Sequence, residues 1–225
     1  MTQNIWLIRH GESAANAGST VVYTNDTPLT EKGEQQSVCV SQAFEQAPDL
    51  IVTSPFLRAQ QTAQATQQRF PDVPVEEWPI QEFTYIAPER CLGLSQDERR
   101  AITREFWLRS DPAHQDPSEH EIESFSHFIG RIDKMLEQMR ALSTDFTAIF
   151  CHGHVIRAVL WQLMRGALPV DEEYMRRFYL WTQALHVPNG SILPVQLAPS
   201  GVLSVQAFAV SHLTSALRPD WNGYL

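Results

Sequence analysis

Short apolar runs recur along the chain and alternate with stretches of helical pattern. Runs of this kind are typical of strands buried on both faces, as in parallel sheets that helices cover. Two further strand-like runs near the end are joined by Pro199-Ser200-Gly201, which predicts a hairpin turn. The predicted strands lie at 5–8, 50–52, 73–78, 146–151, 190–197 and 202–210.

Helices are expected between these strands. One should run over 31–46 with Thr30 as its N-cap, one should include 56–63, and one should follow His152 to about Leu163. The mixed, charged and proline-rich residues 86–117 predict a helical insertion. The sequence Ser118-Glu119-His120-Glu121 has the form of a capping box and predicts the start of the most regular helix. Its buried stripe would be Ile122, Phe125, Ile129, Ile132, Leu136 and Met139.

Strands that alternate with helices predict an α/β fold in three layers, a mainly parallel sheet with helices on both faces. The helical insertion, about 86–141, would lie over the edge where the strands end. We find no internal repeat, low-complexity tract or linker, so the sequence predicts a single domain over 1–225.

Composition and charge narrow the functional classes. Apolar residues make up 43% of the chain and charged residues 19%, as in globular proteins. The net charge of −9 argues against nucleic-acid and membrane-surface partners. No apolar stretch reaches the ~18 residues of a membrane span, and we recognise no secretory signal. Three cysteines without ligand-like spacing favour a reduced, cytoplasmic chain.

Two predicted strands end in a histidine followed by a glycine. The first ends in Arg9-His10-Gly11 and the fourth in Cys151-His152-Gly153. Ligands of open α/β sheets bind where the strands end. Arginine offers a planar fork of donors to an oxyanion, and a neutral imidazole can attack phosphorus. The pattern therefore favours chemistry on a phosphate ester.

Several segments together resemble the histidine phosphatase superfamily, which includes phosphoglycerate mutases and many phosphomonoesterases. The resemblance implies that His10 forms a phosphohistidine and that Arg9, Arg58 and His152 surround the phosphoryl oxygens. It further implies contacts of Asn16 and Gly153 with the substrate, although Asn16 could equally be a turn residue. The matching segments are Leu7-Ile8-Arg9-His10-Gly11-Glu12-Ser13 with Asn16, Asp26-Thr27-Pro28-Leu29-Thr30 with Gly33, Ser54-Pro55-Phe56-Leu57-Arg58-Ala59-Gln60-Gln61-Thr62-Ala63, Glu123-Ser124-Phe125, His152-Gly153-His154-Val155-Ile156-Arg157 and Pro188-Asn189-Gly190-Ser191.

A proton donor for the leaving group is expected just after the third strand, where the resemblance assigns Glu82. One carboxyl group can act as acid and then as base if its surroundings raise its pKa. Glu76 and Glu77 are the alternative carriers of this proton. Helices after His10 and His152 would point backbone N–H groups at the anion. The scheme requires no cofactor and no metal.

These observations predict a metal-independent phosphomonoester hydrolase that acts on a small phosphorylated metabolite. One alternative is a phosphoglycerate mutase-type transferase, and another is a non-catalytic phospho-ligand-binding member of the same fold. Against the mutase, Tyr85-Ile86-Ala87-Pro88 replaces the family's Gly-x-Trp-Glu run. Arg90, Arg99, Arg100 and Arg104 do not match the mutase clamp in position. Phe106 and Trp107 suggest a partly apolar leaving group, but they could equally belong to the core.

Overall fold

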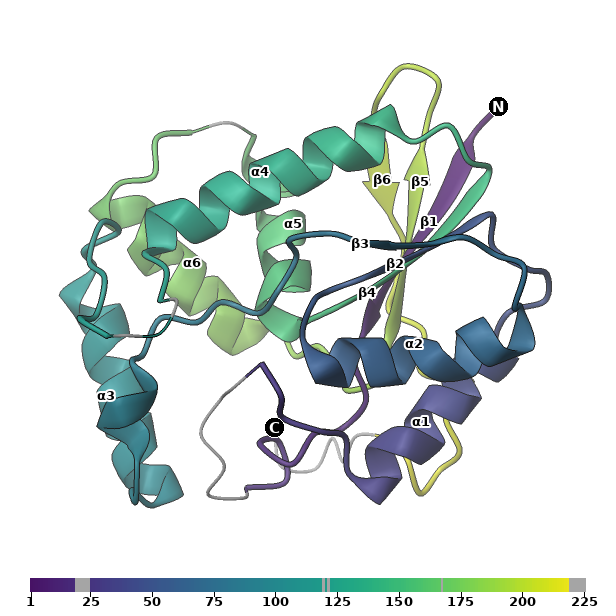
Figure 1. Ribbon diagram of the computed structural model, residues 1–225. Coiled ribbons are helices and arrows are strands. Elements are labelled where there is room, and N and C mark those ends of the chain that lie inside the picture. Colours follow the sequence, from purple (N-terminus) through teal and green to yellow (C-terminus); the bar gives the residue numbers. More distant parts are fainter. Residues whose placement is uncertain (19–24, 119, 121, 167, 219–225) are drawn as a thin grey trace.

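The fold is built on one sheet of six strands, in the order β3-β2-β4-β1-β5-β6 (Figure 1). This computed structural model describes residues 1–18, 25–118, 120, 122–166 and 168–218. The strands are β1 Gln3–Arg9, β2 Leu50–Thr53, β3 Val75–Glu77, β4 Phe146–Cys151, β5 Ile192–Leu197 and β6 Leu203–Val205.

The four strands from the first two thirds of the chain pair in parallel, and the last two are antiparallel additions. The predicted mainly parallel sheet and the terminal hairpin are both confirmed, although β6 is shorter than expected. Arg9 of β1 lies opposite Cys151 of β4. Because these strands run the same way, His10 and His152 leave the sheet side by side.

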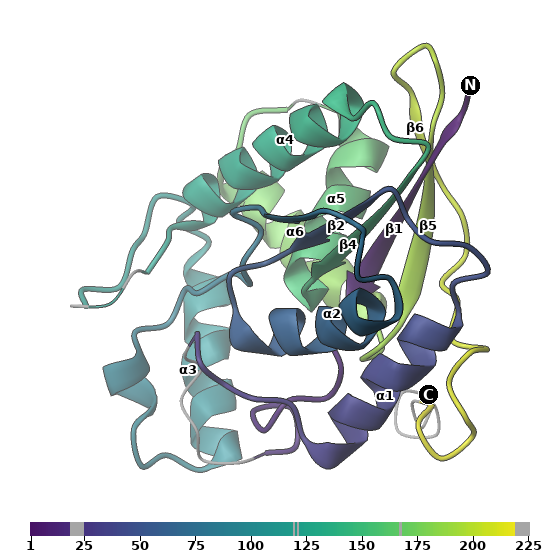
Figure 2. The same ribbon diagram turned by 45° about the vertical axis from the view of Figure 1, so that its right-hand side comes forward.

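Helices cover both faces of the sheet, which confirms the three-layer prediction. α1 (Glu31–Gln42) and α2 (Leu57–Arg69) lie on one face, and α4 (Phe125–Ala141), α5 (Gly153–Arg165) and α6 (Glu172–Ala184) lie on the other (Figure 2). Each face has its own apolar core because successive strand residues point to opposite sides. Ile5 and Leu7 face α4 and α5, whereas Ile8 faces α1 and α2.

The predicted start of the long helix was wrong. Glu119 and Glu121 of the expected capping box lie outside the described residues, and 122–124 are not helical. The N-cap is Ser124, whose hydroxyl accepts from the backbone nitrogen of His127. Just before it, the backbone nitrogen of Glu123 donates to the carbonyl of Thr84, so this residue belongs to a tertiary contact.

The stripe of apolar residues assigned to that helix is buried as predicted, from Ile122 to Met139. α6 was not predicted at all. Its signals were local: Asp171 caps the helix by accepting from the backbone nitrogen of Tyr174, and acidic residues fill the first turn. Its buried side chains, Tyr174 and Phe178 among them, follow a helical spacing.

The expected helical insertion consists of a short 3₁₀ helix, η1 (Pro88–Cys91), and α3 (Gln96–Arg109). Figure 1 shows α3 standing at one side of the molecule, beside α6. α4 instead packs on the sheet. Phe106 and Trp107 are both buried in the core, and Trp107 also borders the cavity described below.

The three cysteines are free and buried. Across the described ranges, no helix combines the length and apolar character needed to cross a membrane.

Candidate active site

His10 lies just beyond β1 and is almost fully buried. Its Nδ1 atom is 2.6 Å from the carbonyl oxygen of Gly11. A carbonyl only accepts, so Nδ1 carries the proton and Nε2 keeps its lone pair. Burial and the neighbouring Arg58, His152 and Arg9 hold the pKa of His10 well below its usual value. The imidazole is therefore neutral at pH 7, with Nε2 available as a nucleophile.

Arg58 comes from the first turn of α2, where a cation opposes the helix dipole. Its side chain is buried, and Nε donates to His10 Nε2 at 3.3 Å. Thr62, one turn later, accepts from the backbone nitrogen of Gly11 and donates to the carbonyl of Arg58. This hydroxyl joins α2 to the loop after β1, which fixes the position of the Arg58 guanidinium relative to the His10 imidazole.

Arg9 is the last residue of β1 and donates to the carbonyl of Val187. Gly153 lies against it: a Cβ atom at Gly153 would lie 3.4 Å from Arg9 Nε and 3.5 Å from Arg157 Nη1. These are ordinary van der Waals distances, so position 153 lies directly against both guanidiniums. Arg9, Arg58 and Gly153 border the same cavity.

His152 faces His10, with 5.1 Å between the ring centroids. Its Nε2 atom lies 2.7 Å from the hydroxyl of Ser54, whereas Nδ1 is buried with no hydrogen-bond partner within the described chain. Burial and Arg58 hold the pKa of His152 well below its usual value. A buried ring nitrogen without a partner is costly unless a ligand completes it.

Only one of the two expected helix N-termini is present at the site. α5 begins at Gly153 directly after His152, as predicted. After His10 the chain continues in turns, and no helix is present in the described residues before α1 begins at Glu31. The prediction of a helix following His10 was wrong because Gly11 and Glu12 pack against Gly33 and Thr30 at the start of α1.

Glu82 follows β3 and reaches the N-terminus of α5. Its carboxylate accepts from the backbone nitrogen of His154 at 3.1 Å and lies 3.6 Å from Nδ1 of the same residue. Burial opposes ionisation, yet His154 and, more weakly, His152 and Arg58 hold the pKa of Glu82 well below its usual value. The expected raised pKa was therefore wrong for the free protein.

The two alternative carboxylates lie elsewhere. Glu76 accepts from the indole nitrogen of Trp78, and Glu77 accepts from Gln60. Both border a different depression, between β3 and α2.

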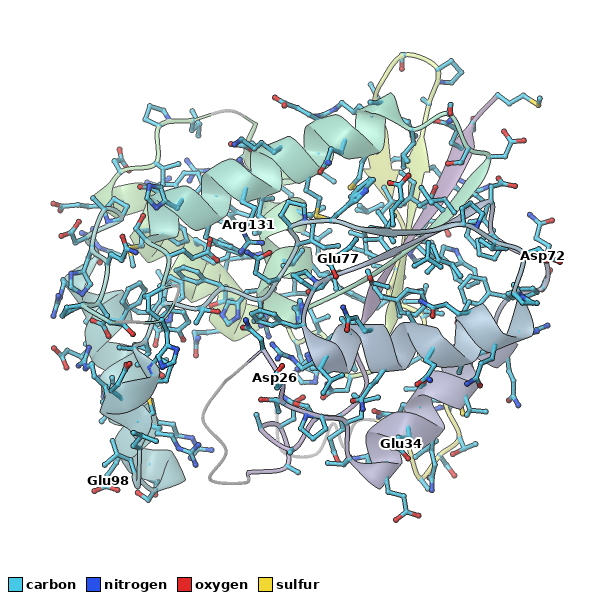
Figure 3. The ribbon with its side chains drawn as sticks, in the orientation of Figure 1. Asp26, Glu34, Asp72, Glu77, Glu98 and Arg131 are labelled. Atoms are coloured by element: carbon cyan, nitrogen blue, oxygen red, sulfur yellow. The ribbon has the colours of Figure 1, made fainter. Side chains whose placement is uncertain are left out.

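Arg131 of α4 fixes the segment that carries Glu82, a role that sequence reasoning missed. Its guanidinium, labelled beside α4 in Figure 3, donates to the carbonyls of Pro79 and Gln81, at 3.1 and 2.9 Å, and it pairs with Glu123. Glu123 itself binds Thr84 through its backbone. The sequence held one signal for this role: Glu123, the ion-pair partner of Arg131, lies in a segment that matches the family.

Asn16 borders the cavity with its amide oxygen already engaged. That oxygen accepts from Ser13 and from Asn189 Nδ2, the latter at 3.0 Å. Asn189 also donates to the carbonyls of His10 and Gly11. The amide nitrogen of Asn16 is thus the group suited to contact an anion.

A cavity of about 660 Å³ opens beside these residues. Its walls come from the end of β1 and the loop that follows it, the segment 82–86 after β3, the N-terminal parts of α2 and α5, and α3 and α6. Within the described chain, six arginines and one carboxylate border it. The arginines are Arg9, Arg58, Arg99, Arg100, Arg104 and Arg157.

The family model described as histidine phosphatase superfamily, branch 1, matches residues 5–188. The chain belongs to the histidine phosphatase superfamily. This confirms the resemblance drawn from the sequence motifs, and it identifies the chain as an enzyme of phosphatase or mutase type.

Curated relatives of both types are similar to this chain. The adenosylcobalamin/alpha-ribazole phosphatase of Salmonella typhimurium is 28% identical over 71% of this chain and 79% of its own length. The 2,3-bisphosphoglycerate-dependent phosphoglycerate mutase 2 of Gloeobacter violaceus is 29% identical over 70% of this chain and 74% of its own length. A shorter match, 42% identical, covers 31% of this chain and only 22% of phosphoglycerate mutase 2 from Arabidopsis thaliana.

Solved structures share the fold. The mycobacterial glucosyl-3-phosphoglycerate phosphatase has a TM-score of 0.68 at 21% identity, covering 92% of this chain and 98% of its own. The phosphoserine phosphatase of Entamoeba histolytica has the same TM-score and identity, covering 94% of this chain and 100% of its own. At these identities the likeness concerns the fold alone.

Proposed function

We propose that this histidine phosphatase superfamily member hydrolyses a small phosphorylated metabolite through a phosphohistidine at His10. The observation that carries the proposal is the neutral imidazole with its Nδ1 proton bound to Gly11 and its Nε2 atom beside Arg58. Attack on a dianionic phosphate ester needs a nucleophile that the dianion does not repel and fixed positive charge around the phosphoryl oxygens. A neutral nitrogen inside a cluster of cations meets both requirements.

In the first step His10 Nε2 attacks phosphorus, and the N–P bond forms as the P–O bond to the leaving group breaks. Arg9, Arg58 and His152 Nδ1 stabilise the charge spread over the phosphoryl oxygens. Asn16 and the backbone N–H of Gly153 add neutral donors.

Glu82 gives a proton to the departing oxygen in this first step. Although its pKa is low in the free protein, a bound phosphate dianion places negative charge beside the carboxylate and raises that pKa. In the second step water attacks phosphorus while Glu82 takes a proton from it. The N–P bond then breaks, which releases inorganic phosphate and restores neutral His10.

All positive charge in this scheme comes from arginines, so we propose that the reaction needs no metal or cofactor. The wild-type protein should therefore hydrolyse p-nitrophenyl phosphate in excess chelator. Acid quenching with a radiolabelled phosphate ester should trap label on His10, and His10→Ala should lose both label and turnover. Undiminished hydrolysis by His10→Ala would overturn the proposal.

A mutase is the second candidate, because its substrate carries a second anionic group, and Arg99, Arg100 and Arg104 border the cavity as additional cations. Arg90 is not among them, since it is bound to Asp116 and Glu105. The Gloeobacter relative is also named a mutase. Incubation with 3-phosphoglycerate and catalytic 2,3-bisphosphoglycerate distinguishes the two activities. We expect inorganic phosphate from a phosphatase, and 2-phosphoglycerate without phosphate release from a mutase.

A cytoplasmic location and the absence of nucleic-acid and membrane partners stay predictions from the sequence.

A further inference from the structure

Beyond hydrolysis itself, we infer that the preferred substrate is a phosphomonoester whose leaving group has a planar or apolar body and ends in a second anionic group. The inference rests on the proposed function, since it concerns the part of the same cavity that would receive the leaving group. The binding surface for the second anion is one face of α3.

The size of the cavity carries the first part of the argument. At about 660 Å³, it falls in the range of pockets that enclose drug-sized ligands. A phosphoryl group held by Arg9 and Arg58 fills only a small part of such a volume. The remainder, bounded by α3 and α6, is available to the leaving group.

The α3 wall of the cavity is cationic. Arg99, Thr103 and Trp107 follow one another at intervals of four residues, with Arg100 and Arg104 beside them, and all five border the cavity. Residues at this spacing share one helix face. Within the described residues, the only carboxylate that borders the cavity is Glu82, which lies outside α3 and is already bound by the backbone of α5. In a chain of net charge −9, this concentration of positive charge is local.

The arginines in and before α3 differ in whether a carboxylate of the protein already binds them. Arg90 is bound to buried Asp116 and to Glu105, and Arg100 pairs with Asp97 in solvent. Arg104, by contrast, makes no ion pair with a carboxylate anywhere in the described ranges. It is thus the guanidinium on this face best able to take a ligand's carboxylate or phosphate.

Aromatic side chains border the same cavity, one of them from α3 itself. Phe83, Tyr85, Trp107 and Tyr179 all border the cavity. Trp107 and Tyr179 stack at 5.3 Å between centroids with an interplanar angle of 11°, and Tyr85 lies 5.4 Å from Trp107. Trp107 is buried and supports the wall, whereas the half-buried rings of Tyr85 and Tyr179 offer surface to a planar or apolar group. A leaving group that spans this wall would bring its far end to α3.

Two isosteric probes test the inference: 4-carboxyphenyl phosphate, which carries the second anion, and 4-carbamoylphenyl phosphate, which does not. The quantity measured is the ratio of kcat/KM for the first probe to that for the second. Comparing this ratio between protein variants cancels the intrinsic difference between the two phenols. Arg109→Gln is the matched control, because Arg109 is on α3 but does not border the cavity.

We expect the wild-type protein to prefer the carboxylate probe, and Arg104→Gln to lower the ratio by about tenfold, the loss of one charge-assisted hydrogen bond. Arg109→Gln should keep the wild-type ratio, and Arg99→Gln gives a second test should Arg104→Gln fold poorly. A wild-type preference for the amide, or an unchanged ratio in both cavity variants, would overturn the inference alone. If neither probe nor p-nitrophenyl phosphate is hydrolysed, the proposed function fails and the inference with it.

Discussion

The carboxylate of Glu82 accepts a hydrogen bond from the backbone nitrogen of His154, at 3.1 Å. The two residues are 72 positions apart, one after β3 and the other in the first turn of α5. The contact brings the proposed proton donor to the N-terminus of α5, where His152 is the N-cap residue. Proton transfer and phosphoryl stabilisation would therefore depend on one helix.

Glu82→Gln should affect alkyl esters much more than activated aryl esters. A basic alkoxide needs a proton to depart, whereas p-nitrophenolate does not. We expect kcat to fall by roughly 10²-fold or more for β-glycerol phosphate, and by less than about tenfold for p-nitrophenyl phosphate. Glu77→Gln is the matched control, since Glu77 lies on β3 at the other depression (Figure 3). Equal losses for both esters would mean that Glu82 only positions the site.

Arg131→Lys tests the positioning of Glu82 from α4. The three donors of a lysine ammonium share one nitrogen and lack the planar fork with which Arg131 reaches two carbonyls and Glu123, so the segment 79–82 should lose its fixed geometry. We expect the loss of kcat, like that of Glu82→Gln, to be larger with the alkyl ester than with the aryl ester, while KM for the aryl ester changes little. Urea unfolding should show a cost of about 1–3 kcal/mol. Lower stability with equal kinetic losses would contradict the positioning role.

Arg58→Ala should lower kcat/KM by about 10²-fold or more, the effect of removing one preorganised donor from a transition state. Arg58→Lys should restore only part of the loss, because an ammonium group lacks the planar fork. Arg69→Ala, at the exposed end of the same helix, is the control for removing a cation. A lysine variant at the wild-type rate would show that Arg58 contributes only positive potential.

The buried histidines make stability depend on pH. Because the pKa values of His10 and His152 are lowered by folding, the unfolded chain binds more protons below about pH 6.5. The contribution of these histidines to the free energy of unfolding should have its full value above that pH. It should fall as the pH decreases, by up to about 1.4 kcal/mol per pH unit for each histidine. Urea titrations from pH 7.5 to 5 measure the slope. His10→Asn should reduce it, and an unchanged slope would contradict the linkage.

The sequence by itself determined most of the elements and their succession along the chain. β4 was predicted to the residue, and the N-cap at Thr30 is confirmed by its contact with the backbone nitrogen of Gly33. These signals are local: apolar runs give strands, and a polar residue before a helix satisfies its first N–H groups. The family followed from motifs for the same reason, because each motif is a short segment.

Local signals failed where a distant segment competed for the same residues. The helix expected from Ser118 starts at Phe125 because Glu123 is bound to Thr84 and Arg131. α6 carried helical signals that we did not use, and its place on the cavity wall depends on packing against α3 and α5.

Tertiary structure alone decided the charge states and the shape of the site. Sequence reasoning expected Glu82 to have a raised pKa, since burial opposes ionisation. The side chain of His154, together with His152 and Arg58, outweighs burial, and no spacing in the sequence reveals contacts between residues so far apart. In the same way, only the packing of α3 turns Arg99 and Arg104 toward the cavity while Asp116 holds Arg90 away from it. Sequence fixes which groups are present, and their interactions depend on distances that exist only after folding.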